Sequence, residues 1–149
     1  MENKEKNTVV DVLQELTLFV NDGVEGYKHA AKEENHEAHK TFYSGLATQR
    51  ERFSEELNQF IRSLGGTPED GTTFKGKLYR QWMDLKAAAT FKNDNAIIGS
   101  CIYGEEWAQK AFNNALEHDE LPANMRTVIE RQKQASLDAM RKLEEMKKG

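Results

Sequence analysis

Apolar residues recur at spacings of three and four along nearly the whole chain, with charged residues between them. This period is typical of amphipathic helices, and no strand-like alternation of apolar and polar residues occurs. Four long segments carry such an apolar face. Representative positions, taken as pairs from successive segments, are Leu16 and Phe19, Leu46 and Phe53, Ile98 and Phe112, and Met125 and Leu143. The pattern therefore predicts an all-α protein.

Turn signals divide these segments. Thr8, with Asp11 three residues later, has the spacing of a capping box and predicts a helix start. Gly65 and Gly66 predict the end of a helix, and Pro122 predicts the start of another. The resulting helices are expected at about 8–34, 36–64, 94–118 and 122–147, with a shorter one at 72–91.

The segment 72–91 lies between two pairs of long helices. At about 1.5 Å per residue, a helix of roughly 20 residues covers about 30 Å, which brings the chain back along most of a bundle. Two antiparallel hairpins joined by such a crossover helix have the connectivity of a ferritin-like four-helix bundle. We expect one such domain over residues 1–149.

Composition narrows the classes of partner. The net charge is −4, and the Lys and Arg residues are interspersed with acids, which argues against a nucleic-acid partner. The single Cys101 excludes an intramolecular disulfide, and its apolar helix face favours a buried side chain over a nucleophile. No apolar run resembles a signal peptide or a membrane span, so we expect a cytoplasmic protein without a membrane partner.

Four polar residues interrupt the apolar faces near the middle of the long helices. An offset of 83 residues places Asp22 over Glu105 and Gln49 over Gln132. Each acid also has a glycine beside it, Gly23 or Gly104. Within each hairpin the acid and the glutamine lie at similar distances from the turn, so all four are expected in one buried polar layer, with Tyr27 close by.

One hypothesis for this layer is a metal site. Ferritin-like bundles hold metal pairs through inward carboxylates and Glu-x-x-His motifs. Asp22 and Glu105, with Glu56 as a third carboxylate, would be the ligands of iron or manganese, and the two glutamines would support them. Arg52 and Ala135, however, stand three residues after Gln49 and Gln132, where a histidine would be needed.

The competing hypothesis is a buried hydrogen-bond network without a metal. Glutamine amides, Tyr27 or Tyr103 hydroxyls, and Arg50 or Arg52 could satisfy the two acids. We favour this network, because a buried acid with such a partner requires no metal, and we expect no cofactor. A second possible ligand group, His36 and His39 with Glu33, lies towards a turn, where a solvated surface is the better explanation.

Several short motifs together resemble a bacterial ferritin-like four-helix-bundle family catalogued as a domain of unknown function. They are Asp22-Gly-x-x-Gly26-Tyr27, Gln49-Arg50, Leu64-Gly65-Gly66-x-Pro68, Gly76-x-Leu78-x-Arg80-x-Trp82, Gly104-Glu105, Leu121-Pro122 and Gln132. The resemblance covers nearly the whole chain and implies a ferritin-like fold without an established activity. Tyr79 and Leu137 stand where relatives usually carry histidine, and Ser100 and Ile102 replace acids, which implies fewer metal ligands here.

These observations favour a non-catalytic, homo-oligomeric bundle, with a dimer as the expected state, that acts as a binding or stress-associated accessory protein. The alternative is a degenerate di-metal carboxylate protein with weak metal-binding or oxidase activity.

Overall fold

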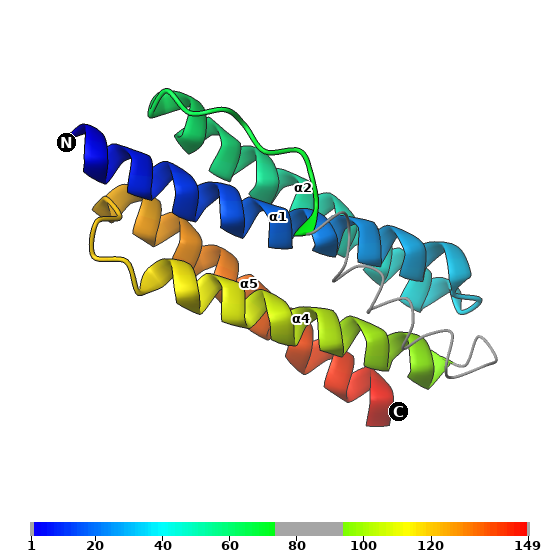
Figure 1. Ribbon diagram of the computed structural model, residues 1–149. Coiled ribbons are helices and arrows are strands. Elements are labelled where there is room, and N and C mark those ends of the chain that lie inside the picture. The colour runs from blue at the N-terminus through cyan, green and yellow to red at the C-terminus, as the bar shows by residue number, and fades with distance from the viewer. Residues whose placement is uncertain (1, 74–93, 149) are drawn as a thin grey trace.

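The chain forms two helical hairpins that pack against each other (Figure 1). The computed structural model describes residues 2–73 and 94–148, and the long regular elements in these ranges are all helices. They are α1 Asn3–Glu33, α2 Glu37–Ser63, α4 Asp94–Leu116 and α5 Ala123–Lys148. α1 packs on α2, α4 packs on α5, and α1 packs on α4. The predicted all-α four-helix bundle is confirmed. The predicted crossover helix, 72–91, lies almost entirely outside the described residues.

The first helix begins earlier than predicted. α1 starts at Asn3, and the Thr8 hydroxyl donates a hydrogen bond to the Lys4 carbonyl, 3.0 Å away, inside the helix. The capping-box interpretation of Thr8 was therefore wrong. The first turns consist of polar and charged residues, which form helices well but carry no apolar periodicity, so the pattern could not reveal them. The other helix ends lie within two residues of the predicted ones.

The glycine pair after α2 fixes a tight reversal of the chain. Gly65 has φ +81°, the left-handed conformation that favours glycine, and the Gly66 N–H donates to the Ile61 carbonyl at 2.9 Å. A Cβ on Gly66 would lie only 2.7 Å from a methyl carbon of Val10. The first glycine therefore permits the turn, and the second permits close packing on α1.

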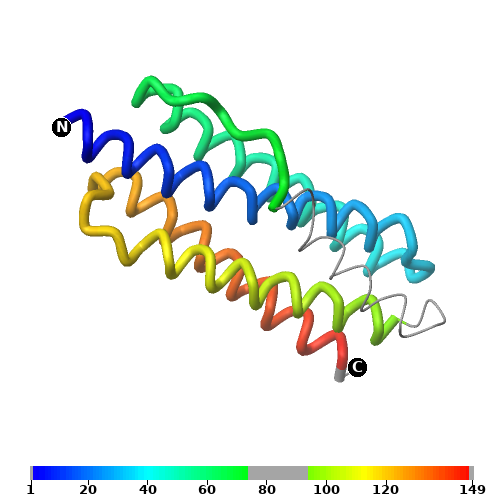
Figure 2. The backbone as a smooth tube through the Cα atoms, viewed as in Figure 1, coloured from blue at the N-terminus to red at the C-terminus, as the bar shows by residue number. Residues whose placement is uncertain are grey.

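The segment after this turn runs back along α1 and α2 (Figures 1 and 2). Asn58 of α2 accepts a hydrogen bond from the Glu69 N–H at 2.8 Å and donates to the Glu69 carbonyl at 3.1 Å. Asn21 of α1 donates to the Gly71 carbonyl at 2.8 Å. These side chains satisfy backbone groups that no regular element satisfies, and they bring Thr73 to the middle of α1.

Two apolar clusters fill the bundle, one on each side of its middle. The first lies towards the N-terminus and contains Val9, Leu13, Leu16, Val20, Phe53, Leu57, Ile61, Ala111, Phe112, Ala115, Leu121, Met125 and Ile129. The second lies towards the turn between α1 and α2 and contains Tyr27, Ala30, Ala31, Tyr43, Leu46, Ala47, Ile97, Ile98, Cys101, Ala139 and Leu143. Along each helix a polar or small residue separates the two clusters. Cys101 is buried, as its apolar helix face predicts.

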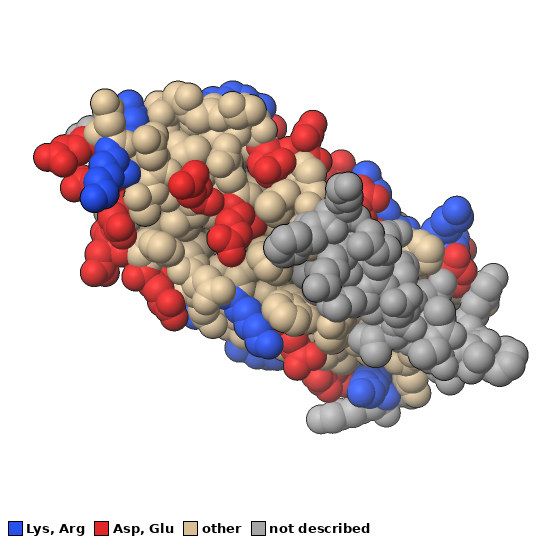
Figure 3. All heavy atoms as spheres, viewed as in Figure 1, with Lys and Arg blue, Asp and Glu red and all other residues tan. Residues whose placement is uncertain are grey.

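The surface carries both signs of charge. In the described part of the face shown in Figure 3, Lys and Arg side chains are scattered among acidic ones. No helix in the described ranges is both long enough and apolar enough to cross a bilayer.

Candidate functional site

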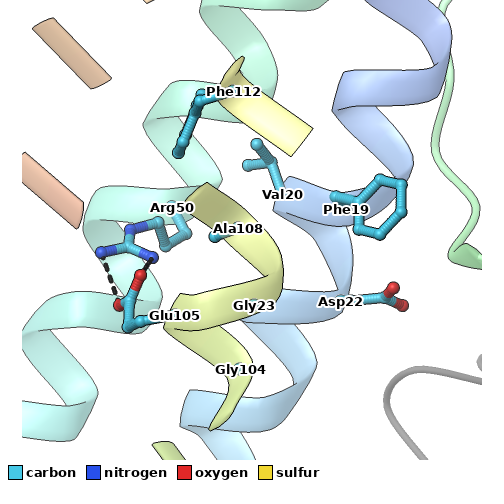
Figure 4. A pocket seen from close by; sticks show the side chains of 9 residues that line it. All are labelled: Phe19, Val20, Asp22, Gly23, Arg50, Gly104, Glu105, Ala108 and Phe112. Carbon is cyan, nitrogen blue, oxygen red and sulfur yellow. Dashed lines mark hydrogen bonds and ion pairs between the residues drawn. The ribbon is translucent and has the colours of Figure 1, made fainter. Parts of the chain in front are cut away.

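The centre of the bundle holds a buried ion pair between α2 and α4. Glu105 is 1% exposed and Arg50 is 2% exposed. The Arg50 Nη1 donates to Glu105 Oε1 at 3.0 Å, and Nη2 lies 2.8 Å from Oε2 (Figure 4). The planar guanidinium thus faces both carboxylate oxygens, a geometry that gives short and strong charge-assisted contacts.

The two remaining helices complete the environment of Glu105. The Ser136 hydroxyl of α5 donates to Glu105 Oε1 at 2.6 Å, and the Tyr27 hydroxyl of α1 donates to Oε2. The guanidinium carbon of Arg50 also lies 5.5 Å from the Tyr27 ring centre and 5.8 Å from that of Phe53, which allows cation–π attraction. One carboxylate therefore joins all four helices.

The protonation states in this cluster follow from burial and from the ion pair. Burial raises the pKa of Tyr27, and the negative charge of Glu105 raises it further, so the phenol stays protonated and donates. Burial alone would lower the pKa of Arg50, but Glu105, together with Tyr27 and Cys101, outweighs burial, and the pKa of Arg50 lies above its usual value. Arg50 is a fixed cation in the bundle.

Asp22 is buried nearby but has a different partner. Its side chain points away from the Arg50–Glu105 pair (Figure 4). The Thr73 hydroxyl donates to Asp22 Oδ2 at 2.5 Å, and the Thr73 N–H donates to Oδ1 at 3.3 Å. Burial raises the pKa of Asp22 to about 6, although both Thr73 hydrogen bonds oppose the rise. Asp22 forms no ion pair with the described residues, and with this pKa its carboxyl group changes its protonation state near pH 6.

Gln49 is not part of the buried layer, contrary to the prediction. It is half-buried, and its Oε1 accepts a hydrogen bond from Arg50 Nε at 3.2 Å. The next residue, Arg50, points inward instead. One step along a helix rotates the side chain by about 100°, so a stripe drawn through residue 49 was displaced by one position. The long side chain of Arg50 reaches Glu105 from there.

Gln132 and Glu56 form a separate polar group between α2 and α5. Gln132 is fully buried, and its Nε2 donates to Glu56 Oε1 at 3.0 Å and more weakly to the Phe53 carbonyl at 3.4 Å. Glu56 also forms an ion pair with Arg131, and its side chain is 34% exposed. Among the described residues, Asp22, Glu105 and Glu56 do not come together as one group of possible metal ligands.

The described side chains around the middle of the bundle do not supply the ligands of a di-metal centre. A guanidinium and two hydroxyls already occupy the oxygens of Glu105. The cavity lined by Asp22, Arg50 and Glu105 holds about 10 Å³, the room of a single water molecule. A pair of hard cations needs several free carboxylate oxygens, and this layer does not supply them.

Sequence reasoning missed two partners of this layer and foresaw two others. Arg50 and Tyr27 were among the expected partners of the acids, and both contact Glu105. Thr73 was missed because it was placed at the start of the expected helix 72–91, and no sequence signal indicated a contact between that segment and Asp22. Asn21 and Asn58, which hold the segment before Thr73, are polar residues on otherwise helical faces. Ser136 lies on the expected inner stripe of α5, and its spacing of four from the buried Gln132 was the available signal.

Comparison with known proteins agrees with this architecture. The sequence profile of a family described as a domain of unknown function, DUF2383, matches residues 8–118. The chain belongs to that family. A search of curated proteins found no match. Among solved structures, the chain is similar to a mutant of Dps1 from Mycobacterium smegmatis, with a TM-score of 0.84 over 99% of each chain and 14% sequence identity. At this identity the likeness shows the fold alone, which is ferritin-like, as predicted.

Proposed function

We propose that this member of the DUF2383 family is a non-catalytic, ferritin-like bundle that serves as a binding or stress-associated accessory protein. The observation that carries the proposal is the fork of Arg50 on Glu105. This fork places a permanent cation of the chain where a metal-binding bundle would need free carboxylate oxygens. Among the described residues, the oxygens of Glu105 are already engaged by Arg50, Ser136 and Tyr27, which supports a structural network in the middle of the bundle.

The network has a defined structural role in this proposal. Glu105 accepts contacts from Tyr27, Arg50 and Ser136, one on each of the other helices. A helix that slipped along the bundle by one turn would leave a buried charge without its partner, which is costly. We assign to the layer the role of fixing the register of the four helices between two apolar clusters that would tolerate other alignments.

Iron loading tests this proposal against a degenerate di-metal centre that binds iron or manganese. The protein is loaded anaerobically with ferrous iron and desalted, and its iron is measured by elemental analysis. The comparison is with the double variant Asp22→Ala, Glu105→Ala. We expect the same iron content in both proteins and no oxidation of ferrous iron above the rate in buffer when air is admitted. Stoichiometric iron that is lost in the double variant would overturn the proposal.

We further propose that the protein self-associates, with a dimer as the expected state, and that it binds no nucleic acid. The net charge of −4 and the scattered Lys and Arg side chains support the second statement. Light scattering at high protein concentration measures the mass of the assembly directly. A monomeric mass under these conditions would exclude the oligomer.

A further inference from the structure

A second group of titratable side chains lies at the end of the bundle, away from the central layer. Glu34 follows the last residue of α1, His39 lies in the first turn of α2, and Asp94 is the first residue of α4. Figures 1 and 2 show that these three helix ends gather at one end of the molecule. One side-chain ligand atom from each of the three residues lies within 4.8 Å of the other two.

Glu34 is the buried member of this group. The residue is 2% exposed, and its side chain is fully buried. The backbone N–H groups of Asn35 and His36 both donate to Oε1 at 3.0 Å, which fixes the orientation of the carboxylate. The other oxygen, Oε2, is buried and faces His39, and among the described residues no donor of ordinary hydrogen-bond geometry reaches it. A buried carboxylate oxygen in this state costs free energy unless a cation or a proton satisfies it.

His39 presents a second unsatisfied atom to the same point. Its Nδ1 is buried, has no hydrogen-bond partner in the part of the chain that the structure describes, and lies 3.7 Å from Glu34 Oε2. This separation is too long for a hydrogen bond. It is close to the distance between two ligands of one ion, which is about 3.0 to 3.6 Å for bonds near 2.1 Å and angles of 90° to 120°. A small adjustment of either side chain would therefore bring the two atoms to the separation of two ligands of one ion.

Asp94 adds a second carboxylate to the group. Burial raises the pKa of Glu34, and a side-chain hydrogen bond with Asp94 and the charge of Asp94 raise it further, as expected for two acids held close together. The hydroxyl of Tyr43 is also buried and has no hydrogen-bond partner among the described residues. Burial raises its pKa, and Cys101, Glu34 and Asp94 nearby raise it further. It is a protonated donor near the group, suited to a water or a carboxylate oxygen at such a site.

We infer that Glu34, His39 and Asp94 form a binding site for one divalent transition-metal ion of the zinc class. An imidazole nitrogen with two carboxylate oxygens suits such an ion better than calcium or magnesium, which prefer oxygen ligands alone. Three protein ligands leave a further position for water. This site is separate from the central layer, and its presence does not depend on the function proposed above.

Zinc binding by the untagged full chain tests the site. The protein is titrated with zinc chloride by calorimetry, and the zinc retained after desalting is measured by elemental analysis. Glu34→Gln keeps an oxygen for the backbone N–H groups but removes the charge, and His39→Ala removes the nitrogen ligand. The matched control is His118→Ala, which removes a partly exposed histidine that lies beside Glu120 near the start of α5.

We expect one zinc ion per chain in the wild-type protein and in His118→Ala, and binding weakened at least about 10-fold in the other two variants. Wild-type protein alone supplies a second measurement, in which zinc should shift the NMR signals of the His39 imidazole and leave those of His118 unchanged. This measurement stands even where a variant fails to fold. Binding of equal strength in all variants, or unshifted His39 signals at saturating zinc, would overturn the inference. Since Asp22 and Glu105 are intact throughout, the result is independent of the iron-loading test.

Discussion

The two acids at the middle of the bundle differ in the partners that compensate for their burial. Asp22 and Glu105 are equivalent by the 83-residue offset between the hairpins, and both are buried. Glu105 contacts a guanidinium and two hydroxyls from three helices. Within the described ranges, Asp22 accepts hydrogen bonds only from Thr73, and its pKa rises to about 6. A buried carboxylate thus depends on its partners to offset the cost of burial.

The largest effect is expected on the Glu105 side, from Arg50→Met. Methionine supplies an unbranched apolar side chain of similar length, but Glu105 is left buried without its cation. Breaking a buried pair in this way costs about 3 to 5 kcal/mol. Urea unfolding of the variant and of the wild-type protein measures the loss of stability.

The control for this prediction is Arg62→Met. Arg62 also pairs with a glutamate, Glu55, at 3.0 Å, but both side chains are at least half exposed, and such surface pairs contribute about 1 kcal/mol or less. Adding Glu105→Gln to Arg50→Met should restore part of the stability, because the unpaired charge is then removed. Equal losses in Arg50→Met and Arg62→Met would mean that the central pair does not hold the bundle together.

On the Asp22 side we expect that removing the carboxylate stabilises the protein, and that this gain grows as the pH rises. The pKa of Asp22 rises from 3.8 to about 6 in the folded chain. Between these values the folded state holds a proton that the unfolded state has released, so this group's contribution to stability falls as the pH rises and is lowest above pH 6. Asp22→Asn removes the charge, and its stability relative to wild type should increase by up to about 2 kcal/mol from pH 4 to pH 7.

Urea unfolding at several pH values gives this difference directly, and other carboxylates cancel in the comparison. Asp11→Asn on the same helix is the matched control, because Asp11 is exposed. Its difference from wild type should stay nearly constant over the same range. A constant difference for Asp22→Asn as well would show that Asp22 is charged at pH 4 in the folded protein, and the contrast with Glu105 would disappear.

The fold could be predicted because helical period, glycine pairs and prolines are local signals that agree with one another. The layer could be located because Asp22 and Glu105 interrupt apolar faces, but the partners of the two acids depend on contacts between distant segments. The predicted inner face of α2 was one residue out of register. It included Gln49, whereas Arg50 is the residue that points into the bundle. Glu34 was passed over for Glu33, because only the end of the helix at residue 33 turns residue 34 into the bundle.

The smallest effect is expected at Gly23, the buried glycine beside Asp22 that lines the cavity next to Arg50. A Cβ at this position would lie 3.9 Å from Arg50 Cγ and 3.9 Å from its Nη1, which is ordinary contact. Gly23→Ala should therefore stabilise the protein by the usual gain for a helix interior, about 0.5 to 1 kcal/mol. Gly45→Ala is the control, because a Cβ there meets nothing within 4 Å. Both gains, measured by urea unfolding, should be similar. A smaller gain or a loss at Gly23 alone would show that Arg50 needs the space beside Asp22, and that the two acids share one packing constraint despite their different partners.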